Sequence, residues 1–245
     1  MKILKHFLFL VLLFSMSACK GKDNPDDPIV PVVPDIGKVK VWLTRGDKAK
    51  LFSQEAELSI RAVTSGEWPL ITVDTSIVFQ EIDGYGASLT GSSAYLLNRV
   101  MSASQRQNVL KQLFDPLEGA GISFLRLTMG ASDFSLSDFT YNDIPINETD
   151  FQLAHFSLSK DLDDVVPVLK EILAINPNIF IMGTPWSPPA WMKTNKSLKG
   201  GKLRSDCYDV YADYFVRYIQ AMKAQGITIP HVTPKNEPLS FTAHY

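Results

Sequence analysis

An amide, a carboxyl group and a proline follow one another in the segment V-T-P-K-N-E-P, residues 232–238, where a strand-like stretch ends. A carboxyl group at a strand end commonly belongs to a site, because the ends of parallel strands gather at one edge of a sheet. Glu237 could transfer a proton, and the amide of Asn236 could hydrogen-bond a sugar hydroxyl beside it. Retaining hydrolysis of a glycosidic bond requires such an acid/base and a second carboxyl group roughly 5–5.5 Å away. Three residues alone are weak evidence for such a site. The value of the N-E-P motif as evidence depends on the other residues that the fold brings near it.

Two tryptophans lie on a proline-rich loop earlier in the chain, T-P-W-S-P-P-A-W-M-K-T-N, residues 184–195. Rigid aromatic surface stacks well on the apolar faces of sugar rings. The alternative is that Trp186 and Trp191 fill a core. Since a core tryptophan does not require a Pro-Pro corner in a long polar loop, we interpret both as the wall of a binding site.

An arginine interrupts the apolar strand I-S-F-L-R-L-T, residues 122–128, and an aspartate follows it in the loop. A buried strand tolerates the charge of Arg126 only where that charge is paired. Its partner could be a carboxylate at a neighbouring strand end, which Arg126 would keep ionised, or one in a purely structural salt bridge. Asp133 lies beyond the same strand end and is a further candidate for the site.

These candidates need a scaffold that brings separate strand ends together, and the pattern of the chain from residue 77 predicts one. Apolar strand-like segments alternate with helical ones, which favours a parallel α/β sheet with helices outside. The predicted strands are 82–87, 122–128, 178–184 and 229–234, and the predicted helices are 102–114, 161–175 and 206–225. The long links 129–160 and 185–204 both follow strands, which is the side where α/β barrels place their chemistry.

The helix ends carry signals of their own. Helix 206–225 has one apolar face and a capping Gly226, and Ser102 or Ser104 caps the first helix. Pro167 either kinks the helix over 161–175 or marks its true first turn. The apolar face of helix 206–225 is formed by Tyr211, Tyr214, Phe215, Tyr218 and Met222.

The first residues resemble an export signal. Lys2 and Lys5 precede a short apolar run, 7–14, and small residues then lead to S-M-S-A-C, ending at Cys19. This is typical of a bacterial lipoprotein signal with Cys19 as the lipidated residue, so we expect a membrane-anchored protein of the bacterial cell envelope, at the outer membrane. The alternative is cleavage nearby followed by release.

Composition divides the chain into four predicted parts. Residues 1–18 form the signal, and residues 19–36, rich in Pro and Asp, form an extended tether. Residues 37–76 contain two strand-like segments, 38–44 and 68–74, of a small β-rich side domain. Residues 77–245 carry the alternating α/β pattern.

Several classes of function are disfavoured by composition. The net charge is −2 and no basic run exceeds two residues, so nucleic acid is not an expected partner. The glycine-rich segment 83–91 has Leu89 at the third glycine position of a dinucleotide fingerprint, so no nucleotide cofactor is expected. The four histidines show no metal-ligand spacing, so we expect no metal site either. They are His6, His155, His231 and His244.

Five segments, in the same order, resemble glycoside hydrolase family 30, which includes glucosylceramidases and β-1,6-glucanases. The resemblance runs from about residue 38 onwards, and it implies a (β/α)₈ TIM barrel with a β-rich side domain built from both chain ends. The segments are D-G-Y-G-A-S-L-T, L-R-L-T-M-G-A-S-D-F-S, D-F-Q-L-A-H-F-S-L, T-P-W-S-P-P-A-W-M-K-T-N and V-T-P-K-N-E-P.

The resemblance assigns a role to each candidate residue. Glu237 would be the acid/base, and Asn236 would contact the 2-hydroxyl of the sugar. Asp133 and Trp186 would bind the glycone, and Arg126 would lie beneath the carboxylates. No cofactor is implied.

The chain departs from the family pattern in two ways. Lys235 stands where the family usually has Gln or Glu. The family nucleophile is a glutamate near the end of the seventh strand, whereas residue 245 falls just after the fourth, so we expect about the first half of the barrel without its nucleophile.

The leading prediction is a retaining hydrolase of a β-glucan or β-glucoside, similar to an endo-β-1,6-glucanase. One alternative is a glucosylceramidase-type β-glucosidase. The other is a surface lipoprotein that binds glycans without cleaving them, or an inactive fragment.

Overall fold

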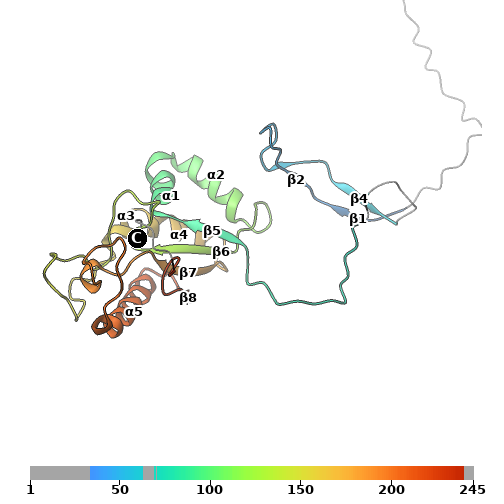
Figure 1. Ribbon diagram of the computed structural model, residues 1–245. Helices are drawn as coiled ribbons and strands as arrows, with labels where there is room; N and C mark the ends of the chain where they lie inside the picture. The colour runs from blue at the N-terminus through green and yellow to red at the C-terminus, as the bar shows by residue number, and fades with distance from the viewer. Residues whose placement is uncertain (1–33, 63–68, 70, 240–245) are drawn as a thin grey trace, which may run out of the picture. The chain divides into compact units, whose positions relative to one another are not determined.

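The computed structural model describes residues 34–62, 69 and 71–239, and Figure 1 shows its helices and strands. Contacts divide the chain into two compact units, Met1–Ile77 and Val78–Tyr245. Cys19 and the predicted signal lie outside the described residues. No helix in the described ranges is long and apolar enough to span a membrane.

The described part of the first unit consists of two antiparallel pairs of short strands. β1 (Asp35–Val39) pairs with β4 (Leu58–Arg61), and β2 (Trp42–Leu43) pairs with β3 (Ser53–Gln54). The strand-like segment 38–44 therefore contains the end of one strand and the whole of the next.

The predicted strand over 68–74 is wrong for the residues that the structure describes there. Residue 69 and residues 71–74 have no strand conformation, and Ile71 and Val73 are largely exposed. Asp74 ends the segment in a turn, where its Oδ1 accepts from the backbone N–H of Ser76 at 2.9 Å. Alternating residues form a strand only when a partner strand is available, and the partner of β1 is instead the unpredicted β4.

The second unit contains a parallel four-stranded sheet in the order β5-β6-β7-β8. Its strands are β5 (Gly86–Leu89), β6 (Phe124–Met129), β7 (Phe180–Pro185) and β8 (His231–Val232). The predicted parallel α/β arrangement is confirmed. The first strand begins later than the predicted 82–87, because pairing with β6 begins at Gly86.

Helices connect the strands, and their ends follow local hydrogen bonding. Ser102 rather than Ser104 caps α2, because Ser102 and Gln105 exchange side-chain-to-backbone bonds in a capping box. The helices are α1 (Gly91–Tyr95), the π-helix Leu96–Val100, α2 (Ala103–Phe114), α3 (Ser159–Asp163), α4 (Val165–Ile175) and α5 (Tyr208–Ala224), with 3₁₀ turns at Ala190–Met192 and Ser205–Cys207.

The single helix predicted over 161–175 is divided into α3 and α4. The break falls at Asp164, whose φ of −137° is not helical. Its carboxylate accepts from the side chains of Asn98 and Arg99, both at 2.7 Å, which fix it outside the helix. Pro167 lies in the first turn of α4, where its missing N–H has no helical partner to lose.

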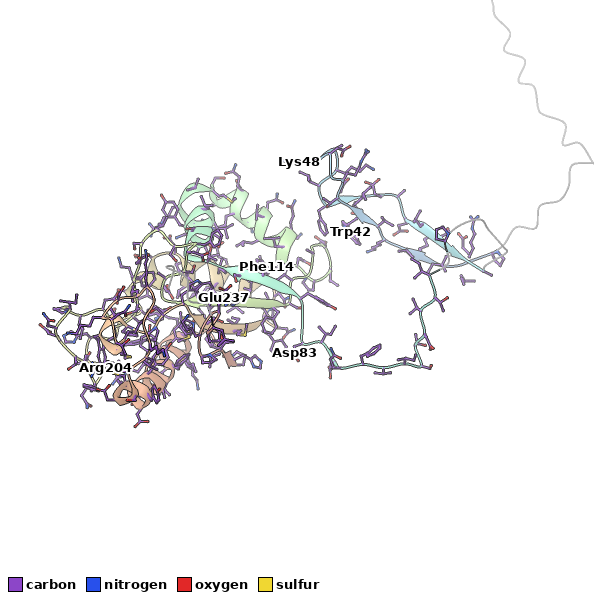
Figure 2. All side chains as sticks on the ribbon, viewed as in Figure 1. Trp42, Lys48, Asp83, Phe114, Arg204 and Glu237 are labelled. Atoms are coloured by element: carbon purple, nitrogen blue, oxygen red, sulfur yellow. The ribbon has the colours of Figure 1, made fainter. Side chains whose placement is uncertain are left out.

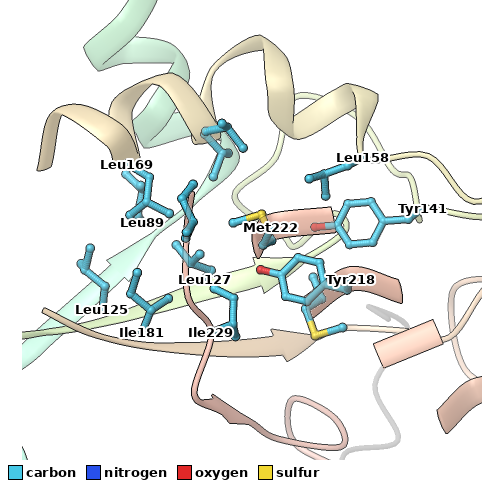
Figure 3. Close-up of a cluster of buried hydrophobic side chains, with 14 of the residues drawn as sticks. Leu89, Leu125, Leu127, Tyr141, Leu158, Leu169, Ile181, Tyr218, Met222 and Ile229 are labelled. Carbon is cyan, nitrogen blue, oxygen red and sulfur yellow. The ribbon is translucent and has the colours of Figure 1, made fainter. Parts of the chain in front are cut away.

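The core lies between the sheet and the helices, as Figure 3 shows. Side chains of β6 alternate, so that Leu125, Leu127 and Met129 are buried against the helices while Arg126 lies on the opposite face. The buried helix residues that meet them include Leu169, Ile172, Tyr214, Tyr218 and Met222.

The predicted apolar face of α5 is confirmed, and Gly226 follows the helix at φ +82°. The sheet comes close to this face at Gly183. A Cβ atom there would lie 3.0 Å from the ring of Tyr218, so the helix and β7 approach each other only because residue 183 has no side chain.

One buried carboxyl lies at the edge of this core. Asp161 accepts a hydrogen bond from the hydroxyl of Tyr141 at 2.6 Å, and the ring of Tyr141 stacks on that of Tyr218 with centroids 5.5 Å apart. Burial raises the pKa of Asp161 to about 7, although the bond from Tyr141 acts in the opposite direction.

We expect Asp161→Asn to remove part of the pH dependence of stability. A carboxyl whose pKa rises from 3.8 to about 7 on folding stabilises the fold at low pH, and this contribution disappears as the pH increases through 7. Between pH 4 and pH 8 the free energy of unfolding of the wild type should fall by up to about 4 kcal/mol relative to that of the variant, at about 1.4 kcal/mol per pKa unit. Urea unfolding at both pH values measures this difference.

The matched control is Asp163→Asn, because Asp163 is exposed on the same short helix. This variant should follow the wild type at both pH values. Equal slopes for the wild type and Asp161→Asn would contradict the prediction.

Candidate functional site

A guanidinium group joins three strand ends of the sheet. Arg126, in β6, donates from Nε to Thr184 Oγ1 of β7 at 3.3 Å and from an Nη to Asn236 Oδ1 at 2.6 Å. Its charged carbon also lies 4.7 Å from the ring centroid of Trp186. The structure therefore brings together Arg126, Trp186 and Asn236, which lie on separate segments of the chain.

The chain after β8 is held against β7 beyond the last pair of the ladder. The backbone N–H of Asn236 donates to Pro185 O at 2.8 Å, and the hydroxyl of Thr233 donates to Thr184 Oγ1 at 2.9 Å. Together with the bond from Arg126, these contacts fix both the backbone and the side chain of Asn236. The backbone that leads into Glu237 is therefore held in a defined position.

The prediction that a carboxylate partners Arg126 is wrong for the described part of the chain. Arg126 forms no ion pair with any residue there. A half-buried guanidinium can instead be satisfied by a neutral oxygen and an aromatic face, because it is planar and more weakly hydrated than an ammonium group. The amide oxygen of Asn236 and the ring of Trp186 supply these two contacts.

Glu237, labelled in Figure 2, has an unusual backbone conformation. Its φ is +44°, in the left-handed region that costs a non-glycine residue roughly 1–2 kcal/mol. Its side chain is exposed, and it makes no hydrogen bond or ion pair with any described residue. Strained backbone of this kind gathers at functional sites, and an exposed carboxyl is free to reach a bound molecule.

Asp133 is not bonded to this cluster. It is exposed in the turn after β6, where Ser132 N donates to Ser135 Oγ at 3.0 Å and shapes the turn. No described residue, Arg126 and Asn236 included, forms a hydrogen bond or ion pair with the side chain of Asp133.

The two tryptophans of the loop after β7 have different environments. Trp186 is half-exposed, as a binding wall requires, whereas Trp191 is only 3% exposed. The indole N–H of Trp191 donates to Asn142 Oδ1 at 2.7 Å, and its ring meets the ring of Phe151 at 74°. The prediction that Trp191 lines a binding wall is therefore wrong, because the Pro-Pro corner turns it into the interior.

The sequence prediction missed Lys193, which is buried in the same loop. Its ammonium donates to Ser187 Oγ at 3.0 Å and to Leu198 O at 2.7 Å, so it ties the two ends of the loop together. Burial lowers the pKa of Lys193 to about 8, and the positive charge of Lys235 acts in the same direction. Its position directly after the apolar A-W-M run was the available signal.

A concave space of about 210 Å³ adjoins the cluster on the face of the sheet opposite the helices. Arg126 is part of its wall, so this space lies on the inner face of the sheet, beside the cluster. The lining residues are Gly84, Gly86, Ala87, Ser88, Phe124, Arg126 and Met182. Over the described ranges, no three His, Cys, Asp or Glu side chains come close enough to hold a metal ion.

Comparisons with known proteins identify the family to which the fold belongs. Residues 82–244 match the glycosyl hydrolase family 30 TIM-barrel domain. An endo-1,6-β-D-glucanase of Neurospora crassa is 35% identical over 185 residues, which cover 74% of this chain and 38% of that protein. A putative glucosylceramidase 4 of Caenorhabditis elegans is 31% identical over 209 residues, covering 82% of this chain and 39% of that protein.

A solved structure is similar as well. An endo-β1,6-glucanase superposes with a TM-score of 0.73 at 36% identity, covering 84% of this chain and 45% of that one. The chain thus spans about two-fifths of the length of the curated relatives that it matches. The chain belongs to glycoside hydrolase family 30, and its parallel sheet is part of that family's TIM barrel.

Proposed function

We propose that the chain supplies the acid/base side of a retaining glycoside hydrolase that cleaves β-glucosidic bonds, in the manner of an endo-β-1,6-glucanase. The observation that carries this proposal is the hydrogen bond from Arg126 to Asn236, which orients the residue directly before Glu237. In this proposal Glu237 protonates the leaving oxygen as the glycosidic bond breaks and later takes a proton from water.

The bond from Arg126 also determines what Asn236 can do. Because the guanidinium only donates, it must face the amide oxygen, which assigns the orientation of the amide. The amide N–H₂ of Asn236 is then directed away from Arg126. It makes no bond to a described residue, so it is available to donate to a sugar hydroxyl.

Trp186 and Asp133 complete the proposed sugar contacts. Arg126 lies against the ring of Trp186 and leaves the indole half-exposed, so a sugar can stack on it. The carboxylate of Asp133 is exposed and can accept from two neighbouring hydroxyls. In retaining hydrolysis the second carboxyl attacks the sugar roughly 5–5.5 Å from Glu237, and we propose that it comes from outside residues 1–245.

The preference for a β-1,6-glucan rests on the relatives. Endo-1,6-β-glucanases are found among both the curated proteins and the solved structures similar to this chain. Glucosylceramidases of about the same similarity make a glucosylceramidase-type β-glucosidase the second candidate. The exposed Glu237 is also compatible with glycan binding without hydrolysis, which the experiments below distinguish.

We expect Glu237→Gln, in the protein expressed from its complete gene, to lower hydrolysis of β-1,6-glucan by roughly 10²–10⁴-fold. A glutamine cannot donate the proton that the leaving sugar needs. The kcat/KM for an aryl glucoside with an acidic leaving group should fall much less, because that group leaves without protonation and kcat/KM does not include the later attack of water. Initial rates at low concentrations of each substrate measure the two kcat/KM values.

The control for this variant is Glu118→Gln, an equivalent change at an exposed site. It should retain both activities. Equal losses of kcat/KM in Glu237→Gln on the two substrates would argue against an acid/base role, and glucan binding without any hydrolysis by the wild type would favour a binding protein.

We expect linear β-1,6-glucan to yield a mixture of oligosaccharides, because an endo-acting enzyme cuts within the polymer. Chromatography of the early products measures their lengths. Release of glucose alone, or of ceramide from glucosylceramide in a parallel assay, would indicate the second candidate instead.

We also propose that Cys19 is lipidated and holds the protein at the bacterial outer membrane. In a bacterial host, Cys19→Ala should abolish labelling with radioactive palmitate and move the protein to the soluble fraction. Cys207→Ala, which removes the other cysteine, should keep the label. Label that persists on Cys19→Ala would contradict the proposed anchor.

A further inference from the structure

A polar groove lies between the loop that follows the Asp150 turn and helix α5, which is drawn in Figure 1. Its volume is about 400 Å³, within the range of about 300–1,000 Å³ that small-molecule sites occupy. Both walls belong to the second unit of the chain. The lining residues are Phe151, Gln152, Leu153, Asp213, Val216, Arg217 and Gln220.

The helix wall of the groove presents three polar side chains on one face. Asp213, Arg217 and Gln220 follow one another at helical spacing, four and three residues apart, so they project to the same side of α5. Together they offer a carboxylate, a guanidinium and an amide. These groups are planar, and between them they can both donate and accept hydrogen bonds.

Most of this bonding capacity is unused by the protein. Within the described ranges, the side chains of Gln152, Asp213 and Gln220 make no hydrogen bond or ion pair. Arg217 donates one bond, from an Nη to Gln152 O at 2.8 Å, and keeps its other donors. Asp213 and Arg217 form no ion pair with each other, although they stand four residues apart.

The loop wall is held firmly in place. The carboxylate of Asp150 accepts from Asn142 Nδ2 at 2.9 Å, from Ala154 N at 2.9 Å and from His155 N at 2.8 Å. Leu153, at φ +50°, forms the bend inside this loop. The groove is therefore built before any ligand arrives, which lowers the entropy cost of binding.

The groove is also lined by an aromatic residue, Phe151. Phe151 is 44% exposed, and its ring packs against the ring of Trp191 with centroids 5.5 Å apart. An exposed ring beside unpaired planar polar groups is the combination that recognises a sugar, whose faces are apolar and whose rim carries hydroxyls. One acidic and one basic residue balance each other in the groove, which favours a neutral ligand.

We propose that this groove is a second glycan-binding site, separate from the catalytic one, which holds a short neutral gluco-oligosaccharide segment of the polymer. The proposal rests on the proposed function for its choice of glycan. Binding one segment in the groove raises the effective concentration of the rest of the same polymer at the catalytic site. The gain applies to long glucans and is absent for short substrates.

The test is the double variant Asp213→Ala/Gln220→Ala, made in the protein expressed from its complete gene. Both residues are exposed and have no bonded partner among the described residues, so the fold should tolerate their loss. Affinity electrophoresis in gels that contain soluble β-1,6-glucan measures binding. The affinity of the double variant for the glucan should be about tenfold lower than that of the wild type, as expected for two lost hydrogen bonds. Asp209→Ala, an equal charge change on α5 outside the groove, should bind like the wild type.

A second measurement separates this proposal from the catalytic one. Hydrolysis of a small aryl β-glucoside should be the same in the double variant and the wild type, because that substrate is too short to reach the groove. Unchanged glucan affinity in the double variant, or no glucan affinity in an active wild type, would overturn the proposal of a binding groove. Neither result would affect the catalytic proposal. Glucan affinity that depends on the groove, in a protein without hydrolysis, would support the groove and overturn the catalytic proposal.

Discussion

The candidate site depends on one half-buried guanidinium group. The hydrogen-bonded pairs between β7 and β8 extend over only two residues, so the sheet alone holds its last strand weakly. Arg126 reaches across β7 to Asn236 at 2.6 Å, and its charge assists this bond. The chain before Glu237 is thus fixed by a side chain of β6 in addition to its own bonds to β7.

Among the described residues no carboxylate pairs with Arg126, whose contacts are an amide oxygen and an aromatic ring. An ion pair would have satisfied Arg126 locally and would have left the amide of Asn236 free to rotate. Bonded to the amide oxygen and stacked on Trp186, the guanidinium instead orients two groups that can meet a sugar. The energetic cost of a desolvated arginine is offset by a charge-assisted hydrogen bond and a cation–π contact.

Features with a strong local signal were predictable from the sequence, and features set by long-range partners were not. The apolar face of α5 and the parallel order of the strands follow from periodicity, and both were predicted. The break at Asp164 depends on Asn98 and Arg99, more than sixty residues earlier, which periodicity cannot register. Trp191 was misplaced for the same reason, because Asn142 accepts its indole N–H from a different loop.

Hydrogen bonds join the two long loops, and they connect the candidate site to the groove beside α5. Trp191 in the loop after β7 bonds to Asn142 in the loop after β6, and Asn142 in turn donates to Asp150. Asp150 shapes the turn that carries Phe151, whose ring returns to Trp191. Because this circuit is closed and buried polar groups are costly to leave unpaired, neither loop can shift alone. Loops are otherwise the most adaptable part of an α/β fold. Here they hold the half-exposed Trp186 and the groove at a fixed distance and orientation from each other. A polymer that contacts both would require such a fixed arrangement.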